Sequence, residues 1–279
     1  MTSRRMMKAG LAIGLAASFH IAMAQVQLAQ QRGAVDPRVQ QRTYLFADTN
    51  EQMPYALFAS SKVSKDKKNP LIISLHGLGG TQDTMVRESL RSVQLAEEGG
   101  YILVTPMGYN CGGWYGIPAG APRGGGGLAC PGGGTAVTDN AKVRELSEKD
   151  VMTVLDTMRK EFNVDERRIY IMGHSMGGSG TLYLASKYPQ IWAAAAPIAP
   201  PGAGGPGVAE SLGMSKLPTF VVQGDADTAV PVAGTRAFID RLKAQNAVYE
   251  YLEIPGATHN ITGIPEIYKF FEKHSKPVR

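Results

Sequence analysis

The sequence lacks an apolar run long enough to cross a membrane, any internal repeat and any sign of a second domain. Its N-terminal apolar run, residues 9–17, is short and is soon followed by His20, whereas a membrane-spanning helix needs about 20 apolar residues. No group of residues has the spacing of a metal site. We therefore expect one domain without a membrane span or a metal site.

The chain begins with a basic segment (Arg4, Arg5 and Lys8), which is followed by the apolar run and then by an Ala-x-Ala site, Ala22-Met23-Ala24. This order is typical of a cleaved secretory signal peptide, so we expect residues 1–24 to be removed and the protein to be secreted or periplasmic. No cysteine follows the cleavage site, which argues against a lipid anchor. Losing three basic residues lowers the net charge from +5 to +2, which gives no case for nucleic acid as a partner.

Cysteine is scarce, with only Cys111 and Cys130. In an oxidising compartment the two are able to form a disulfide, and two buried free thiols are the alternative. They are 19 positions apart, so a bond would add roughly 3 kcal/mol to the free energy of unfolding. They lie in a glycine-crowded segment, residues 106–134, with Trp114 and Tyr115. A loop this long is either functional or disordered, and the aromatic pair favours function.

Apolar runs alternate with helical periodicity along residues 43–279, after a Gln- and Arg-rich lead-in at residues 25–42 that we expect to be flexible. Ser147-x-x-Asp150 resembles a capping motif that opens a helix. This alternation predicts one α/β domain with a mostly parallel sheet covered on both faces. The expected strands are 42–48, 53–60, 71–75, 101–104, 168–172, 191–198, 219–222 and 248–254, and the expected helices 81–98, 147–162, 181–185, 234–245 and 264–274.

A Gly-x-Ser-x-Gly pattern, Gly173-His174-Ser175-Met176-Gly177, stands directly after one of the apolar strands and before a helix. In this context the pattern predicts a nucleophile elbow, a tight strand-to-helix turn that exposes a serine hydroxyl. An ordinary small-residue turn is the alternative. We take Ser175 as the candidate nucleophile.

A serine hydroxyl needs a base to accept its proton. His259 fits best, because it lies in a small-residue loop after the strand that ends near Pro255. His174 adjoins the serine and is expected to point elsewhere, and His274 lies in a terminal helix among charged residues. His76 is interpreted as structural.

Two aspartates are candidates to orient the histidine, because Asp225 and Asp227 both follow the preceding strand. The spacing Gly-x-x-Asp-x-x-Val-Pro favours Asp227, and Asp225 is then expected to cap the turn. A calcium site at this pair lacks the required glycine and the distal glutamate. The chain order Ser175, Asp227, His259 is that of an α/β-hydrolase.

An oxyanion needs backbone N–H donors, one from the residue after the nucleophile and one from the loop after the third strand. These are Met176 and, in the His76-Gly77-Leu78 turn, Leu78. Trp114 and Tyr115 follow a strand that ends near the same edge of the sheet, so we expect them to line the substrate pocket.

With these motifs together, the chain resembles the α/β-hydrolase superfamily over nearly all of its mature length. The segment 163–189, Leu75-His76-Gly77-Leu78-Gly79-Gly80 and the Gly224 to Pro231 motif are similar to those of secreted feruloyl esterases, polyhydroxybutyrate depolymerases and predicted peptidases. The resemblance implies a serine esterase without a cofactor, acting on a small or polymeric ester. An oligopeptidase or amidase with the same triad and a binding module on this fold are the alternatives.

Overall fold

An eight-stranded sheet organises the computed structural model, which describes residues 33–118 and 130–277. The strands follow the order β1-β2-β4-β3-β5-β6-β7-β8 across the sheet. Neighbours are parallel from β4 to β8, and β2 runs antiparallel to both β1 and β4. The strands are β1 (Gln40–Phe46), β2 (Glu51–Ala59), β3 (Asn69–Leu75), β4 (Ile102–Pro106), β5 (Val164–His174), β6 (Ala194–Ile198), β7 (Thr219–Gly224) and β8 (Tyr249–Ile254). The predicted α/β class with a mostly parallel sheet is confirmed.

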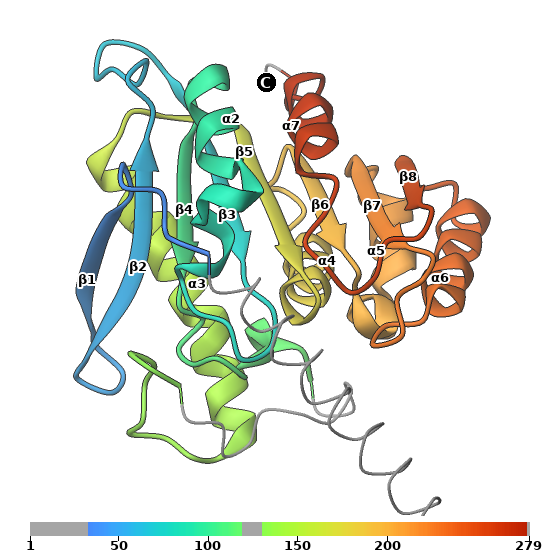
Figure 1. Ribbon diagram of the computed structural model, residues 1–279, viewed down its shortest axis with the longest axis horizontal. Helices are drawn as coiled ribbons and strands as arrows, with labels where there is room; N and C mark the ends of the chain where they lie inside the picture. Colours follow the sequence, from blue (N-terminus) through green and yellow to red (C-terminus); the bar gives the residue numbers. More distant parts are fainter. Residues whose placement is uncertain (1–32, 119–129, 278–279) are drawn as a thin grey trace, which may run out of the picture. The chain divides into compact units, whose positions relative to one another are not determined.

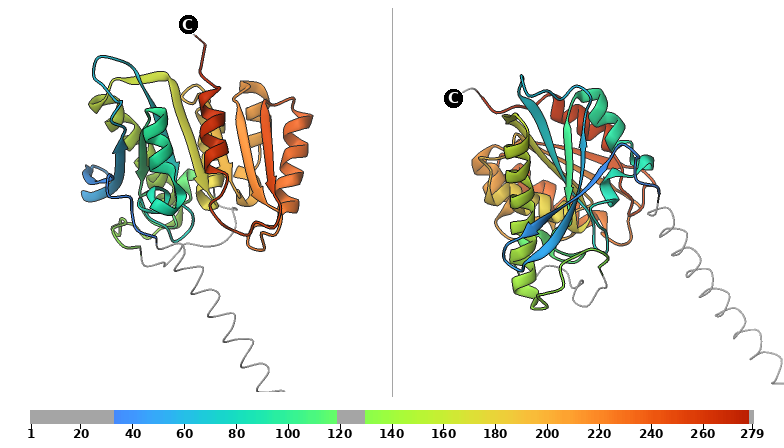
Figure 2. Two further views of the ribbon diagram at one scale, coloured as in Figure 1. Left: turned by 45° about the horizontal axis from the view of Figure 1, so that its top comes forward. Right: turned by 90° about the vertical axis from the view of Figure 1, so that its left-hand side faces the viewer.

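Helices cover both faces of the sheet (Figures 1 and 2). On one face lie α2 (Ser92–Gly99) and α7 (Ile264–Glu272), and on the other α3 (Asn140–Glu161), α4 (Met176–Lys187), α5 (Val208–Ser215) and α6 (Val232–Ala244). Successive residues of a strand point to opposite faces, so Leu71 and Ile73 of β3 join the core under α3 and α4 while Ile72 joins the core under α2 and α7. Short 3₁₀ turns occur at η1 (Thr84–Val86), η2 (Glu88–Leu90), η3 (Trp114–Gly116) and η4 (Pro201–Gly204).

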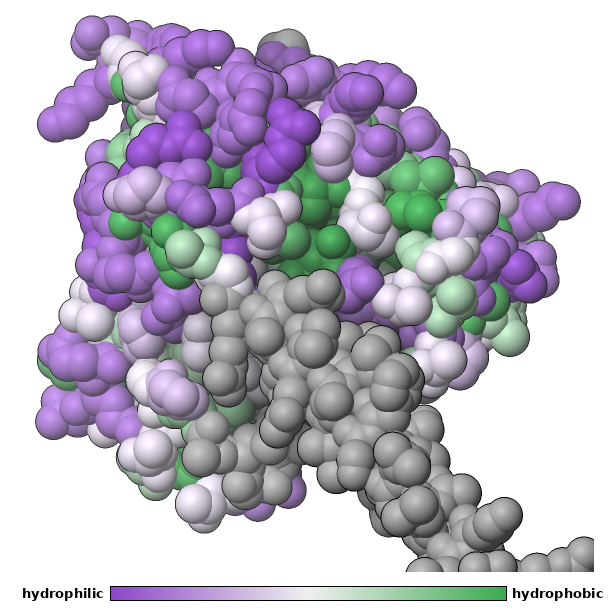
Figure 3. Space-filling model, in the orientation of Figure 1, coloured by the Kyte–Doolittle hydropathy of each residue, from purple (hydrophilic) through white to green (hydrophobic). Residues whose placement is uncertain are grey.

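The face with two helices is the less completely covered one. Leu252 and Ile254 at the β8 end of the sheet stay half-buried while packing against this core. In Figure 3 hydrophobic residues gather in the middle and right of this face, surrounded by hydrophilic ones. None of the helices within the described ranges is long and apolar enough to cross a membrane.

Three expectations from the sequence are wrong in detail. The helix expected at 81–98 is α-helical only from Ser92, because Arg87 is extended (ψ 144°) and Arg91 is left-handed (φ 58°), which interrupts the helix. The lead-in is ordered where it is described: Asp36 N–H donates to Val86 O, and β1 begins at Gln40. The compact unit accordingly begins at Val35, earlier than residue 43. The signal peptide, residues 1–24, lies outside the described residues.

The third difference concerns Ser147 and Asp150, which do not cap a helix. The N-cap of α3 is Asp139, whose side chain accepts from Lys142 N–H, and the helix begins two turns earlier than expected. Ser147 and Asp150 lie inside α3, where both are completely buried and point at the segment after β4. A local pattern that resembles a cap is here a pair of tertiary anchors.

Candidate active site

Ser175 lies at the turn between β5 and α4 in a conformation that few non-glycine residues adopt, with φ 55° and ψ −119°. Its backbone N–H donates to Ile198 O of the neighbouring strand at 2.8 Å. The turn tolerates no side chain on either flank: a Cβ on Gly173 would lie under 3.0 Å from Gly177 O, and one on Gly177 equally close to Leu75 O. The sequence thus forms the strained elbow that its Gly-x-Ser-x-Gly pattern predicts.

The loop after β8 brings His259 to this serine. His259 Nε2 lies 2.9 Å from Ser175 Oγ, and Nδ1 lies 2.7 Å from Asp227 Oδ2. The three residues come from three separate loops at the carboxyl edge of the parallel strands. A carboxylate at Nδ1 holds the proton on that nitrogen, which leaves Nε2 free to accept the serine proton.

The Asp227 carboxylate is fully buried, and three donors besides His259 compensate it. Oδ1 accepts from the backbone N–H groups of Ala229 (2.9 Å) and Val230 (2.8 Å), and Oδ2 accepts from Gln223 Nε2 at 3.1 Å. Gln223 also donates to Val230 O and accepts from Thr235 Oγ1. Sequence reasoning missed Gln223, although a glutamine at the end of an otherwise apolar strand, directly before the Gly224 motif, is the signal that was available.

The expectation that Asp225 caps the turn after β7 is wrong, because the backbone N–H groups of Ala229 and Val230 in that turn donate to Asp227. The exposed side chain of Asp225 instead accepts from Gly256 N–H at 2.6 Å and so ties the loop after β7 to the loop after β8. Of the two aspartates only Asp227 contacts His259, so the geometry assigns the orienting position to Asp227.

Of the other candidate histidines, His174 lies beside the site, whereas His76 and His274 form hydrogen bonds with backbone carbonyl groups. His174 does not point away from the site as expected: its ring centroid lies 4.7 Å from that of His259. Burial is the larger cause that lowers the pKa of His174 to about 3, and repulsion from a positive charge on His259 is the second. His76 is buried with its ring nitrogens 2.8 Å from Gly77 O and Met107 O, and burial lowers its pKa. His274 Nδ1 lies 2.8 Å from Phe270 O at the end of α7.

Two backbone N–H groups lie beside the nucleophile without an acceptor among the described residues, those of Leu78 and Met176. Met176 is the first residue of α4, where an N–H has no partner within the helix and the helix dipole favours negative charge. Leu78 lies in the turn after β3, and its side chain is 44% exposed. The two groups are suited to receive an oxyanion.

A cavity of about 860 Å³ opens beside α4, along its residues Ser179, Tyr183 and Ser186. Ser179, one helical turn after Ser175, contributes to its wall, and Trp114 faces it from η3. The other walls are mostly apolar. They come from Ile117 and Pro118, from the segment 201–208, and from one or two residues each of α4 (Tyr183, Ser186), α5 (Ser211) and α6 (Arg241). Trp114 therefore lines a cavity, and its contact with substrate stays a prediction.

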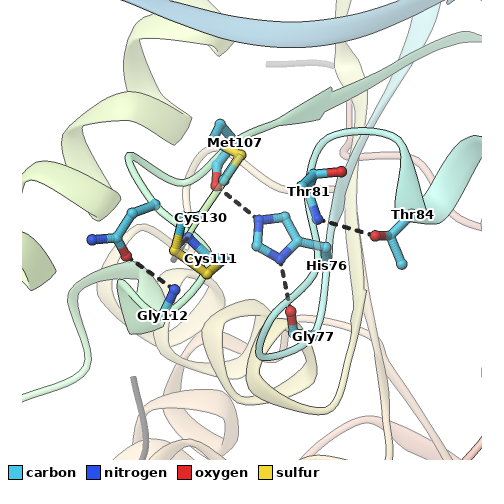
Figure 4. Close-up of a disulfide and its surroundings, with 9 residues drawn as sticks. His76, Gly77, Thr81, Thr84, Met107, Cys111, Gly112 and Cys130 are labelled. Carbon is cyan, nitrogen blue, oxygen red and sulfur yellow. Dashed lines mark hydrogen bonds between the residues drawn. A yellow bond between two sulfur atoms is a disulfide. The ribbon is translucent and has the colours of Figure 1, made fainter. Parts of the chain in front are cut away.

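Tyr115 does not line that cavity, which corrects the expectation that the aromatic pair acts together. Its side chain is completely buried, and its hydroxyl donates to His76 O at 3.0 Å. Cys111 and Cys130 form the disulfide that the sequence allowed, with Cα atoms 5.4 Å apart. Figure 4 shows this disulfide beside His76 and the turn that contains Gly77.

Within residues 33–118 and 130–277, no group of three or more His, Cys, Asp or Glu side chains is arranged to hold a metal ion. What the candidate site offers is a serine, a base and two amide donors.

Comparison with known proteins agrees with this geometry. The PET hydrolase-like family matches residues 142–270. Over 85% of this chain and 90% of the other, the chain superposes with a TM-score of 0.63 and 17% identity on a CE1 ferulic acid esterase from Anaeromyces mucronatus solved with ferulic acid. This chain has the α/β-hydrolase fold.

Two curated relatives are similar over part of the chain. Cutinase 2 of Thermobifida cellulosilytica is 37% identical over 113 residues, 40% of each chain. The bis(hydroxyethyl) terephthalate hydrolase of Streptomyces coelicolor is 36% identical over 115 residues, 41% of this chain and 34% of the other. The similar region of these relatives thus spans about a third to two fifths of their length. The chain thus resembles polyester hydrolases in sequence and a feruloyl esterase in fold.

Proposed function

We propose that this α/β-hydrolase is an exported serine esterase that cleaves carboxylic esters through an acyl-enzyme. The observation that carries the proposal is the chain of contacts from Ser175 Oγ to His259 Nε2 and from Nδ1 to Asp227. The resemblance to cutinases and to a ferulic acid esterase supports an ester over a peptide as the substrate. The Cys111–Cys130 disulfide supports export to an oxidising compartment.

In the proposed reaction Ser175 Oγ attacks the ester carbonyl while His259 Nε2 takes its proton. The carbonyl oxygen becomes an oxyanion that accepts from Leu78 and Met176 N–H. His259 then returns the proton to the departing alcohol. A water molecule, deprotonated by His259, attacks the acyl carbon and frees Ser175. Asp227 stays ionised and stabilises the imidazolium in both halves of the cycle.

We place the acyl group in the cavity beside α4, whose lining includes Ser179, four residues after Ser175, but no residue of the triad. Its volume of about 860 Å³ and its mostly apolar walls, with Trp114 on one side, suit an aromatic or aliphatic acyl group. We propose esters of such acids as substrates, in small molecules or in polymers. A panel of bis(hydroxyethyl) terephthalate, a feruloyl ester and a short-chain p-nitrophenyl ester distinguishes among them.

Replacing Ser175 by Ala tests the proposal. We expect the variant to lose turnover of the p-nitrophenyl ester by at least about a thousandfold, because removing a triad nucleophile leaves only oxyanion stabilisation and binding. A serine-reactive phosphonate should label the parent protein at Ser175 and should not label the variant. A parent protein that neither labels nor turns over any ester would point to a binding module, and turnover of peptide amides alone would point to a peptidase.

A further inference from the structure

We propose that residues 107–117, held by the Cys111–Cys130 disulfide and by Ser147 and Asp150 of α3, position the turn that presents the Leu78 amide to the oxyanion. We name residues 107–117 the bracing loop and residues 76–80 the oxyanion turn. The inference rests on the proposed esterase function and adds positioning residues outside the triad.

The bracing loop contacts the oxyanion turn through three hydrogen bonds. Gly79 N–H donates to Cys111 O at 2.8 Å, and Tyr115 OH donates to His76 O at 3.0 Å. His76 Nε2 lies 2.8 Å from Met107 O; Figure 4 marks this contact with a dashed line. The bracing loop therefore contacts the oxyanion turn at His76, before Leu78, and at the N–H of Gly79, directly after Leu78.

The bond from Gly79 to Cys111 fixes one conformation of the turn. Gly80 N–H donates to Gly77 O at 2.9 Å, and Gly79 has φ +75°, the pattern of a type II turn with Leu78 and Gly79 at its centre. In a type I turn the peptide between these two residues is rotated by about half a turn. That rotation would aim Gly79 N–H away from Cys111 O. The carbonyl of Cys111 thus favours the type II form and fixes the Leu78–Gly79 peptide, which directly follows the Leu78 N–H in the turn.

The bracing loop would not hold its own shape without anchors. Tyr109, Trp114 and Tyr115 all have positive φ, at 62°, 56° and 52°, a backbone region that is costly for residues with a Cβ. Asp150 Oδ2 accepts from Gly108 N–H at 2.6 Å and from Tyr109 N–H at 3.0 Å. Ser147 Oγ accepts from Tyr115 N–H at 3.0 Å. These anchors fix both ends of the loop, and the disulfide fixes Cys111 between them.

Loosening the loop should impair the oxyanion donor and leave the triad intact, since no triad residue contacts the loop through a hydrogen bond in the described part of the chain. Deleting one oxyanion donor lowers kcat by roughly a hundredfold to a thousandfold. A displaced donor costs less, so we expect kcat to fall by about tenfold to a hundredfold with KM nearly unchanged.

The experiment uses the full chain with Cys111→Ser and Cys130→Ser together, and separately Asp150→Ala and Asp150→Asn. We measure kcat and KM for p-nitrophenyl acetate, whose acetyl group is too small to depend on Trp114 of the loop. We also measure the affinity for a trifluoromethyl ketone that forms an oxyanion on Ser175, and the acid limb of the pH–rate profile. The cysteine double variant and Asp150→Ala should lose kcat and ketone affinity by similar factors while the acid limb stays in place. Asp150→Asn, which still accepts hydrogen bonds from Gly108 and Tyr109, should retain most of both.

Val154→Ala is the stability control, because it opens a core cavity on α3 one turn beyond Asp150 and removes no hydrogen bond to the bracing loop. A comparable loss of kcat in Val154→Ala would overturn the proposal, because destabilisation alone would then explain the effect. Unchanged kcat in a folded cysteine double variant would also overturn it, as would a change in KM alone. If the double variant does not fold, the pair Asp150→Ala and Asp150→Asn decides, and equal kcat in the two overturns the proposal. Loss of the esterase proposal itself is recognised separately, by a parent protein without Ser175-dependent turnover.

Discussion

The imidazole ring of His174 lies against the ring of His259, with centroids 4.7 Å apart and ring planes inclined by 43°. His174 is nearly fully buried, and its Nε2 has no hydrogen-bond partner among the described residues. Because its pKa is lowered to about 3, His174 stays neutral wherever His259 works as a base. His174 therefore packs against the ring of His259 without placing a positive charge beside that ring.

This buried neutral histidine predicts acid sensitivity of the fold. In the unfolded chain a histidine gains a proton near pH 6.5, whereas folded His174 resists it down to about pH 3. Between these values the unfolded state binds the extra proton, so the free energy of unfolding falls as the pH falls, by at most about 1.4 kcal/mol per pH unit. His174→Phe keeps a ring in place and removes this term. Urea unfolding at pH 7 and pH 5 should show a smaller loss for the variant, and equal losses would contradict the assignment.

The two aspartates after β7 offer a matched pair of substitutions. Asp227→Asn should lower kcat by about a thousandfold to ten-thousandfold, because an amide no longer stabilises the imidazolium or fixes its tautomer. Asp225→Asn keeps an oxygen for the exposed bond to Gly256 N–H and should change kcat less than about threefold. Steady-state kinetics on one ester compares them, and similar losses in both variants would show that geometry has misassigned the orienting carboxylate.

Gln223 is expected to act through Asp227. Gln223→Met preserves the length of the side chain but removes its bonds to Asp227, Val230 and Thr235, so that the carboxylate loses one of its three donors. We expect kcat to fall by about tenfold, in line with one lost hydrogen bond to a charged group, and KM to stay the same. Gln223→Glu should be worse, because it places a second carboxylate beside the first. A fall in melting temperature without a change in kcat would leave Gln223 a purely structural residue.

Much of this site was predictable because its parts are local. The elbow needs small residues at fixed offsets around Ser175, and parallel strands bring the loops that follow them to one edge, so Asp227 and His259 were found from their positions after strands. Leu78 and Met176 followed from the same rule.

What failed depends on contacts between distant segments. Ser147 and Asp150 have the spacing of a cap, yet they anchor residues 108–115, between 32 and 42 positions earlier in the chain. Tyr115 follows Trp114 directly but faces the other way, since both have positive φ within η3 and the hydroxyl of Tyr115 reaches His76. Periodicity and local patterns carry no information on which distant segment a side chain meets.

Trp114 tests whether the cavity beside α4 receives the acyl group. Trp114→Ala removes a large apolar wall and should raise KM for an aromatic ester by about tenfold, a loss of about 1.4 kcal/mol in binding. KM for an acetate ester should change less than about threefold, because an acetyl group is too small to reach that wall. Equal changes for the two substrates would place the acyl group elsewhere.

Asp150 predicts a dependence on pH of opposite sign to that of His174. Burial raises its pKa from 3.8 to about 6, against the hydrogen bonds from Tyr44, Tyr109 and Gly108. Between about pH 4 and pH 6 the folded state keeps a proton that the unfolded state has released, so stability falls as the pH rises through this window.

The variant Asp150→Asn has no proton to lose at this position. The free energy of unfolding of the variant, relative to the parent, should rise by about 2–3 kcal/mol from pH 4 to pH 7. Asp156→Asn, which removes an exposed charge from the same helix, is the matched control. A constant difference between Asp150→Asn and the parent across this range would mean that Asp150 is ionised throughout, and that its three donors outweigh its burial.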